Sequence, residues 1–395
     1  MLGNILEAVE KYEDSFIKIR RELHQYPELD FKLDKTQEIV TRYLDEINIK
    51  YKKNIGYSGI VADIEGKDKS ITIAIRADMD ALPIEEKNKC EYVSKNRGQM
   101  HACGHDAHTA ILLGIGKIIS EYREELPCNV RLIFQPAEET TGGAEPMIKD
   151  GVLDSVDCIF GLHVNPEINC GKVGIKYGVM YASSTGVEIK VNGKSSHGAY
   201  PSFGIDAIVV MASIINSLQT IVSRNTDARD SLVLSLGKIS GGVKENIIAD
   251  EVICSGTMRT LSEKVKQSSK DRIKEMVEYI SKGYGAEGKV NFSDSYISLL
   301  NNDEYVDLVK DNVISLLGKE NIEIKKNASL GVEDFSYYVA KVPGTFFELG
   351  VKNEKRGIVA PLHNERFDID EKALIIGVKL GIMNIFSAFL KLKRS

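Results

Sequence analysis

Histidine and cysteine side chains gather in one short stretch of the chain, MHACGHDAH, which spans residues 100–108. The chain of 395 residues has seven histidines, and three of them lie here: His101, His105 and His108. Cys103 stands among them. A thiolate and an imidazole together suit zinc or a similar borderline metal. In an extended segment Cys103 and His105 would point to the same side and could hold one ion. The alternative is a group of buried, hydrogen-bonded histidines beside a core cysteine.

A metal site needs further ligands, and donor residues follow two predicted strands. Glu138 and Glu139 end the segment CNVRLIFQPAEE, and His163 ends the segment DCIFGLHV. Adjacent glutamates point in different directions, so one carboxylate can bind metal while the other faces a substrate as a general base. Taken singly, the glutamates are equally compatible with a solvated acidic turn, and His163 with a core histidine.

Other polar residues are less informative on their own. Asp78 and Asp80 end the strand SITIAIRADMD, where aspartates also serve to cap turns. His363 lies in the loop PLHNERFD near the C-terminus. Three residues of the middle of the chain would, by themselves, be a surface histidine and ordinary strand-end residues: His197, Asn246 and Arg259.

The elements around these residues alternate between helix and strand over the first 180 residues. Strands are predicted at SGIVADIEG, SITIAIRADMD, CNVRLIFQPAEE and DCIFGLHV, and a helix at DAHTAILLGIGKIISEYREEL with Asp106 as its N-cap. This alternation predicts an α/β fold with a mostly parallel sheet flanked by helices. Ligands of such sheets bind at the carboxyl ends of the strands, which is where the predicted donors stand.

The pattern changes near residue 182, where the order becomes β-α-β-β-α-β. That order is typical of the ferredoxin-like motif. We therefore expect a small α+β domain over residues 182–295, inserted into a larger domain formed by residues 1–181 and 296–395.

Composition excludes several classes of partner. The chain is 43% hydrophobic, and 51 Lys and Arg against 57 Asp and Glu give a net charge of −6, which argues against nucleic acid as a partner. Early acids such as Glu7 and Glu10 argue against a signal peptide. Apolar stretches are broken by charges such as Lys379, so we expect no membrane span. Six scattered cysteines form no disulfide framework, which favours a reduced, cytoplasmic protein.

Together, the motifs resemble those of the dinuclear-metal amidohydrolases related to aminoacylase. The branch that fits includes hippurate hydrolases, auxin-conjugate hydrolases and N-acetyl-diaminopimelate deacetylases. The similarity runs through nearly the whole chain, in LHQYPEL, RADMDALPIEE, MHACGHDAH, FQPAEE, GGAEPMI, GLHV, HGAYP, SGGVKENIIAD, GTMRT, GVEDFSYY and PLHNERFD. The resemblance implies a metal-binding α/β domain with an inserted ferredoxin-like lid.

The resemblance also implies two divalent metal ions per subunit, Zn²⁺ or Mn²⁺, with Co²⁺ and Ni²⁺ also compatible with such donors. The implied ligands are Cys103, His105, Glu139, His163 and His363, with Cys103 bridging the two ions. Arg76 departs from other branches of the superfamily, which place a liganding histidine at that position. Asp78 is then expected to orient a ligand.

In function, the resemblance implies a metal-dependent hydrolase of N-acyl amino acids such as hippurate or N-acetyl amino acids. Glu138 would be the general base, and His197, Asn246 and Arg259 would contact the substrate. A homodimer is expected, in which His197 reaches the partner's site. Two alternatives are a carboxypeptidase or dipeptidase on the same scaffold, and a non-catalytic metal or amino-acid binding protein, which would be expected to lack Glu138.

Overall fold

The computed structural model describes residues 2–394, which form two compact units. The first unit is drawn from Met1–Met180, Leu300–Asn327 and Asp334–Ser395, and the second from Tyr181–Leu299 and Ala328–Glu333. The sequence pattern put the changes of domain after residues 181 and 295. The pattern did not indicate that the chain re-enters the second unit at Ala328–Glu333. That segment forms no helix or strand, so its sequence has no periodicity.

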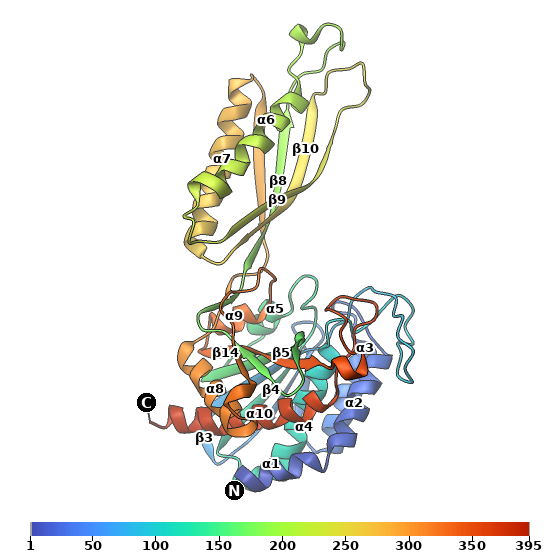
Figure 1. Ribbon diagram of the computed structural model, residues 1–395, viewed down its shortest axis with the longest axis vertical. Coiled ribbons are helices and arrows are strands. Elements are labelled where there is room, and N and C mark those ends of the chain that lie inside the picture. Colours follow the sequence, from blue (N-terminus) through green and yellow to red (C-terminus); the bar gives the residue numbers. More distant parts are fainter. Residues whose placement is uncertain (1, 395) are drawn as a thin grey trace. The chain divides into compact units, whose positions relative to one another are not determined.

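The first unit contains an eight-stranded sheet in the order β1-β2-β4-β3-β5-β14-β6-β13. Figure 1 labels its four central strands, β4, β3, β5 and β14. These four strands are mutually parallel. β1 pairs antiparallel with β2, β2 with β4 and β6 with β14, whereas the edge strand β13 pairs parallel with β6. The strands are β1 Tyr51–Ile55, β2 Gly59–Ile64, β3 Asp68–Asp78, β4 Cys128–Gln135, β5 Cys158–Asn169, β6 Val173–Ile175, β13 Ile322–Ile324 and β14 Gly344–Lys352.

Helices cover both faces of this sheet, and the predicted α/β architecture is confirmed. The helices α4 and α10 pack on β3, and α9 packs on β5 and β14. The helices are α1 Leu2–Glu10, α2 Glu13–Gln25, α3 Asp34–Glu46, α4 His105–Glu121, α5 Ala144–Lys149, α8 Asp303–Leu317, α9 Phe335–Val339 and α10 Lys372–Leu392. Short 3-10 turns lie at Arg123–Glu125, Lys319–Asn321 and Glu354–Arg356.

The strand β3 shows why the sheet forms in this way. Its residues from Ile71 to Asp78 are all buried, because helices cover both faces of a parallel sheet and leave neither to water. This apolar strand contains one charged pair, Arg76 and Asp78, and both side chains are fully buried. Charges persist in such a setting only when they are paired, so the end of β3 is a specialised polar site.

The second unit has the predicted ferredoxin-like order, and its four strands form an antiparallel sheet in the order β11-β8-β10-β9. Its elements are β8 Ser183–Asn192, α6 Ala207–Thr220, β9 Leu232–Gly241, β10 Glu251–Thr260, α7 Glu263–Gly283 and β11 Glu287–Asp294. A 3-10 turn lies at Pro201–Phe203 and a π-helical turn at Ile221–Asn225. The short strands β7 Val179–Tyr181 and β12 Leu299–Leu300 pair where the chain changes unit.

Among residues 2–394, two helical segments are long and apolar enough to span a membrane by length and composition alone: Ala207–Asn225 and Lys372–Leu392. In α10, 67% of the apolar window is buried within the protein. Its residues Leu374, Val378 and Ile382 are fully buried, so this apolar helix is accounted for by core packing.

Candidate metal centre

The turn that carries Cys103 and His105 is not extended, contrary to the expectation from their spacing. Gly104 between them has a left-handed backbone with φ 86° and serves as the N-cap of α4, whose first residue is His105. A Cβ at Gly104 would lie 2.3 Å from Cγ2 of Val164, so only glycine fits both the backbone and the space. Asp106 is therefore not the predicted cap, and its buried carboxylate instead bonds Arg20 and His24.

Cys103 stands at the centre of the predicted ligands, which come from four separate segments. Its Sγ lies 3.3 Å from Nε2 of His163 and 3.4 Å from Nε2 of His363. Oε1 of Glu139 lies 3.3 Å from Nε2 of His363 and 3.8 Å from Nε2 of His105. Two donor groups thus share the thiol: Cys103 with His105 and His163, and Cys103 with Glu139 and His363, each with its donor atoms within 4.8 Å of one another.

Local hydrogen bonds hold these donors in place. Nδ1 of His163 donates to the carbonyl of Val164 at 2.7 Å, so the lone pair of Nε2 is directed toward Cys103 and can bind a metal. The backbone N–H of His363, a residue with φ 60°, donates to the carbonyl of Ala102 at 2.8 Å. This bond brings the C-terminal loop of the first unit against the Cys103 turn.

The two glutamates after β4 are positioned by Asp80. Its Oδ1 accepts the N–H of Glu138 at 2.9 Å, and its Oδ2 accepts the N–H of Glu139 at 3.0 Å. The preceding Ala137 is left-handed, with φ 57°. Donor oxygens of both glutamates lie within 4.8 Å of a ring nitrogen of His105, so both carboxylates face the same space.

The buried donors fit a cation. Both ring nitrogens of His105 and Oε1 of Glu139 are buried and make no hydrogen bond among residues 2–394, although charged groups lie 3.3–3.8 Å from each of them. Buried polar atoms without a hydrogen bond are rare because each costs about 1–3 kcal/mol. Thiol, imidazole and carboxylate are also the donor types that bind divalent transition metals, so divalent ions would satisfy these atoms.

The electrostatics of the cluster favour positive charge. Burial opposes the imidazolium of His105, but Asp78, Asp80 and Glu139 outweigh it and raise the pKa to about 10. Burial also opposes the Glu139 carboxylate, yet His363 and His105 lower its pKa to about 2. Burial and then the carboxylates of Glu139 and Glu138 raise the pKa of Cys103 well above its ordinary value. A bound cation would reverse that last effect, because a coordinating thiol is deprotonated.

Asp78 and His108 form a pair behind the donors. Oδ1 of Asp78 lies 2.6 Å from Nδ1 of His108, and Oδ2 accepts from Arg76 at 2.7 Å. Nε2 of His108 accepts the N–H of Val164 at 2.8 Å, so both ring nitrogens of His108 are used. His101 is buried and, like His108, is absent from both donor groups that share Cys103.

The sequence indicates for Asp80 only the capping of a turn, and for His101 and His108 a role in packing or in orienting a ligand. Asp80 follows β3 and is predicted to cap the turn there. In the structure its carboxylate instead accepts the backbone N–H groups of the loop after β4. The place of His108, one helical turn after His105, does not indicate which atoms it bonds. Its bonds depend on β5, a strand more than 50 residues away.

The remaining predicted residues lie in the second unit. His197 and Asn246 are exposed neighbours: the N–H of Gly198 donates to the carbonyl of Asn246 at 2.8 Å, and Nδ1 of His197 accepts from Ala199 at 3.1 Å. Arg259 lies on β10, opposite Ser184 of β8. Its Nη1 is buried and lacks a hydrogen-bond partner in the described part of the chain, and burial lowers its pKa.

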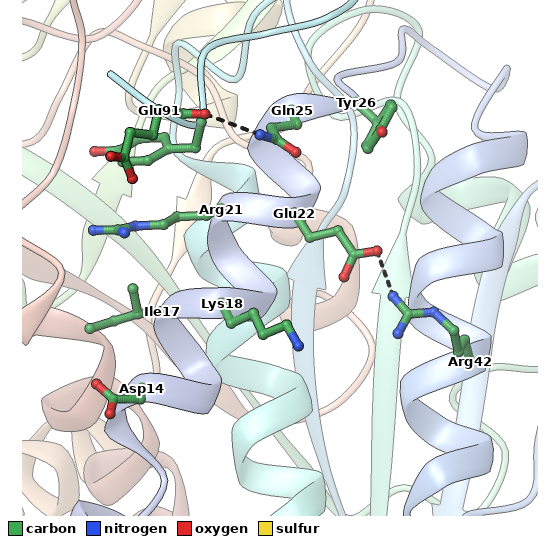
Figure 2. Close-up of a pocket in the computed structure, with 10 residues that line it drawn as sticks. Asp14, Ile17, Lys18, Arg21, Glu22, Gln25, Tyr26, Arg42 and Glu91 are labelled. Carbon is green, nitrogen blue, oxygen red and sulfur yellow. Dashed lines mark hydrogen bonds and ion pairs between the residues drawn. The ribbon is translucent and has the colours of Figure 1, made fainter. Parts of the chain in front are cut away.

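A separate open groove of about 690 Å³ lies along α2 and α3 and is lined by none of the predicted site residues (Figure 2). Both arginines that line it are paired with glutamates: Arg42 with Glu22 at 2.6 Å, and Arg21 with Glu371 at 2.7 Å. The groove lacks the cysteine and histidine donors that gather around Cys103.

Known proteins are similar to this chain over most of its length. Residues 74–382 match the family described as peptidase family M20/M25/M40. The chain is 39% identical over 381 residues to thermostable carboxypeptidase 1 of Saccharolobus solfataricus, covering 95% of this chain and 96% of that protein. It is 39% identical over 364 residues to N-acetyl-L-cysteine deacetylase of Bacillus subtilis, covering 92% and 85% respectively.

Among solved structures, the YXEP protein of Bacillus subtilis, described as a dinuclear metal binding peptidase, is similar with a TM-score of 0.86 and 32% identity, over 96% of this chain and 99% of that one. The predicted resemblance is thus confirmed, and the protein is a metal-dependent hydrolase. From the family match, the relatives and the fold together, the chain belongs to peptidase family M20/M25/M40.

Proposed function

We propose that this hydrolase cleaves the amide bond of N-acyl amino acids at a centre of two divalent ions. The observation that carries the proposal is the pair of donor groups that share Cys103 and face Glu138. The ligands proposed are Cys103, His105, Glu139, His163 and His363. The deacetylase name of one relative supports an N-acyl amino acid as the substrate class. Zn²⁺ and Mn²⁺ are the first ions to test, followed by Co²⁺ and Ni²⁺.

Glu138 is proposed as the general base. When bound, divalent ions polarise an amide carbonyl and lower the pKa of water. Glu138 takes one proton from the attacking water and delivers it to the leaving nitrogen, as the C–O bond forms and the C–N bond breaks. The products are a carboxylate and a free amino acid. The low exposure of Glu138, 7%, would keep bulk water from competing for that proton.

Arg259 is proposed to bind the carboxylate of the amino-acid part. Its buried, unpartnered Nη1 is a hydrogen-bond donor without an acceptor in the described chain. A carboxylate would supply that acceptor in bidentate geometry, which is the pairing that guanidinium favours. Simple amides lack this carboxylate and would bind more weakly.

His197 and Asn246 are proposed to act in the partner subunit's site. Arg259 lies eight residues along β10 from Glu251, a span of about 26 Å at strand spacing, while Asn246 belongs to the loop before Glu251. One N-acyl amino acid is far shorter than that span. A single second unit therefore cannot place both Arg259 and His197 on one substrate, whereas two units from a two-fold dimer can.

A homodimer is supported by the exposed surface of the second unit. The strand β9 is an edge strand that pairs only with β10 in its sheet. Ile239 on β9 and Ile208 and Val209 on α6 are 56%, 50% and 50% exposed. If two second units associated through β9 and α6, the unpaired edge of β9 and the exposed apolar side chains of α6 would both be covered.

The main alternative is a carboxypeptidase or dipeptidase, which the name of another relative favours. Both activities break an amide next to a free carboxylate and differ only in the acyl part. Metal-stripped protein should be reloaded with Zn²⁺ or Mn²⁺ and given hippurate, N-acetyl amino acids and dipeptides. Hydrolysis of the N-acyl substrates at least tenfold faster than of dipeptides supports the proposal, and the reverse order favours the peptidase. Metal binding without hydrolysis of any of them would overturn the proposed substrate class. A cytoplasmic location remains a prediction.

A further inference from the structure

Arg76 occupies an unusual place beside the centre. Its side chain is fully buried near the carboxyl end of the central strand β3, and all three guanidinium nitrogens have partners. Nε donates to Oε1 of Gln135 at 2.8 Å, Nη1 to Oδ2 of Asp78 at 2.7 Å, and Nη2 to Oδ1 of Asp334 at 2.8 Å. One guanidinium thus bridges two buried carboxylates from different segments of the first unit.

Asp78 is close enough to the centre to be a metal ligand. Its Oδ2 lies 3.7 Å from Nε2 of His105, and donor atoms of Asp78, His105 and His108 lie within 4.8 Å of one another. Both oxygens of Asp78 are nevertheless occupied by donors, Oδ1 by His108 and Oδ2 by Arg76. What withholds the carboxylate from the centre is therefore its hydrogen bonding, since the distance alone would allow it to bind.

Arg76 cannot easily release Asp78, because its other end is anchored. Asp334 accepts from Nε2 of Gln135 at 2.9 and 2.8 Å and from the N–H of Ala144 at 3.0 Å. Gln135 and Asp334 thereby fix one side of the Arg76 guanidinium, and the other side donates to Asp78. A lysine at this position could reach one carboxylate but could not bridge both.

We propose that Arg76 is a specificity-determining residue for the metal centre: it withholds the Asp78 carboxylate from the ligand set and so biases the centre toward ions that favour sulfur and nitrogen donors. The inference rests on the metal centre proposed above. Thiolate and imidazole favour Zn²⁺, whereas each added carboxylate oxygen favours Mn²⁺. Freeing Asp78 would add one oxygen donor next to His105.

The test compares the dissociation constants of Zn²⁺ and Mn²⁺ for the metal-free full-length chain, measured by competition with a chromophoric chelator. Arg76→Met, which can hold neither carboxylate, should lower the ratio of the Mn²⁺ to the Zn²⁺ dissociation constant by at least tenfold. Arg76→Lys, which can hold only one of them, should lower it by at least threefold. Arg20→Lys is the matched control, since Arg20 is also fully buried and paired with three carboxylates but does not contact Asp78. It should lower stability and leave the ratio unchanged.

A second substitution separates specificity from general loosening of the fold. Asp78→Asn in the Arg76→Lys background removes the competing oxygen charge and should restore the wild-type ratio. A ratio within twofold of wild type in Arg76→Lys, or a shift that persists in the double variant, overturns the inference. Arg76→Lys serves alone if Arg76→Met does not fold. Failure of the wild-type chain to bind either ion would instead refute the metal centre itself.

Discussion

At the scale of single residues, the centre depends on which atom of each side chain is left free. The Nδ1 bond of His163 to Val164 leaves its Nε2 for the centre, whereas His108 has both ring nitrogens engaged. Two histidines of similar burial therefore have different uses. Residue type alone does not distinguish them, but their hydrogen bonds do.

Cys103 is predicted to be indispensable for metal binding. Cys103→Ser should fold but lose most of its bound metal and its activity, because a serine hydroxyl does not ionise as a thiol does. Elemental analysis of the purified variant, with circular dichroism to check the fold, measures this. Cys170→Ser, at a half-buried cysteine outside the centre, should keep both metal and activity. Full metal content in Cys103→Ser would show that the thiol is only a core residue.

The adjacent glutamates are predicted to differ in role. Glu138→Ala should keep its metal and lose kcat by about 10²-fold or more, the scale of general-base loss. Glu139→Ala should lose metal first, because its Oε1 lies against His363 and His105. Metal content and kcat measured on both variants decide the assignment. The reverse pattern would mean that the two roles are exchanged.

At the scale of elements, the turn into α4 brings Cys103 and His105 to the same centre. Gly104→Ala should disrupt this turn, since a left-handed alanine costs about 1–2 kcal/mol and its Cβ would meet Val164 at 2.3 Å. We expect a lower melting temperature and loss of bound metal. Gly171→Ala is the control: Gly171 has φ 94° with nothing within 4 Å of its Cβ, so it should lose stability but keep metal. Equal metal content in both variants would contradict this account of the turn.

A buried ionic cluster joins α2 to the start of α4 and to the segment before α10. Arg20 pairs with Asp106 at 2.8 Å and with Asp368 at 2.9 Å. Burial alone would raise the pKa of Asp368, but Arg20 outweighs it and holds that pKa below the ordinary 3.8. The unfolded chain thus binds more protons at acid pH. The stabilisation is present above about pH 4 and is lost as the pH falls through the folded pKa.

Arg20→Met should therefore destabilise the metal-free chain by about 3–5 kcal/mol at pH 7 and reduce the acid dependence of its stability. Denaturant unfolding from pH 3 to pH 7 measures both effects. Arg42→Met removes an arginine that is 42% exposed and should cost less than about 1 kcal/mol. An acid slope equal to wild type in Arg20→Met would show that the cluster does not set the pH dependence.

At the scale of the whole molecule, the proposed function needs residues from both units, and His197 is predicted to come from a partner subunit. His197→Ala and Glu138→Ala should each lose activity without losing metal. Unfolding, mixing and refolding the two inactive variants would form heterodimers in which one site has both wild-type residues. Partial recovery of activity supports a shared site. No recovery, in a sample shown to contain heterodimer, would contradict it.

The sequence alone was enough to predict both sheets and the family, because these depend on periodicity and on motifs of adjacent residues. β3 and β4 were read from apolar runs, and the inserted domain from a change of period. The turn at Gly104 was mistaken for an extended segment, since a single left-handed glycine leaves no mark on apolar periodicity. Asp106 was mistaken for a cap because capping is the commoner role of an aspartate at a helix start.

Only the tertiary structure decided which polar residues meet. Cys103 and His363 are 260 residues apart, and their contact depends on one backbone bond between His363 and Ala102. Arg76 and Asp334 are 258 apart, and nothing near either residue in sequence indicates the pair. Local sequence determines the period and the chemistry of each segment. Which distant side chains come into contact depends on the order of the strands in the sheet. That order results from many individually weak packing interactions.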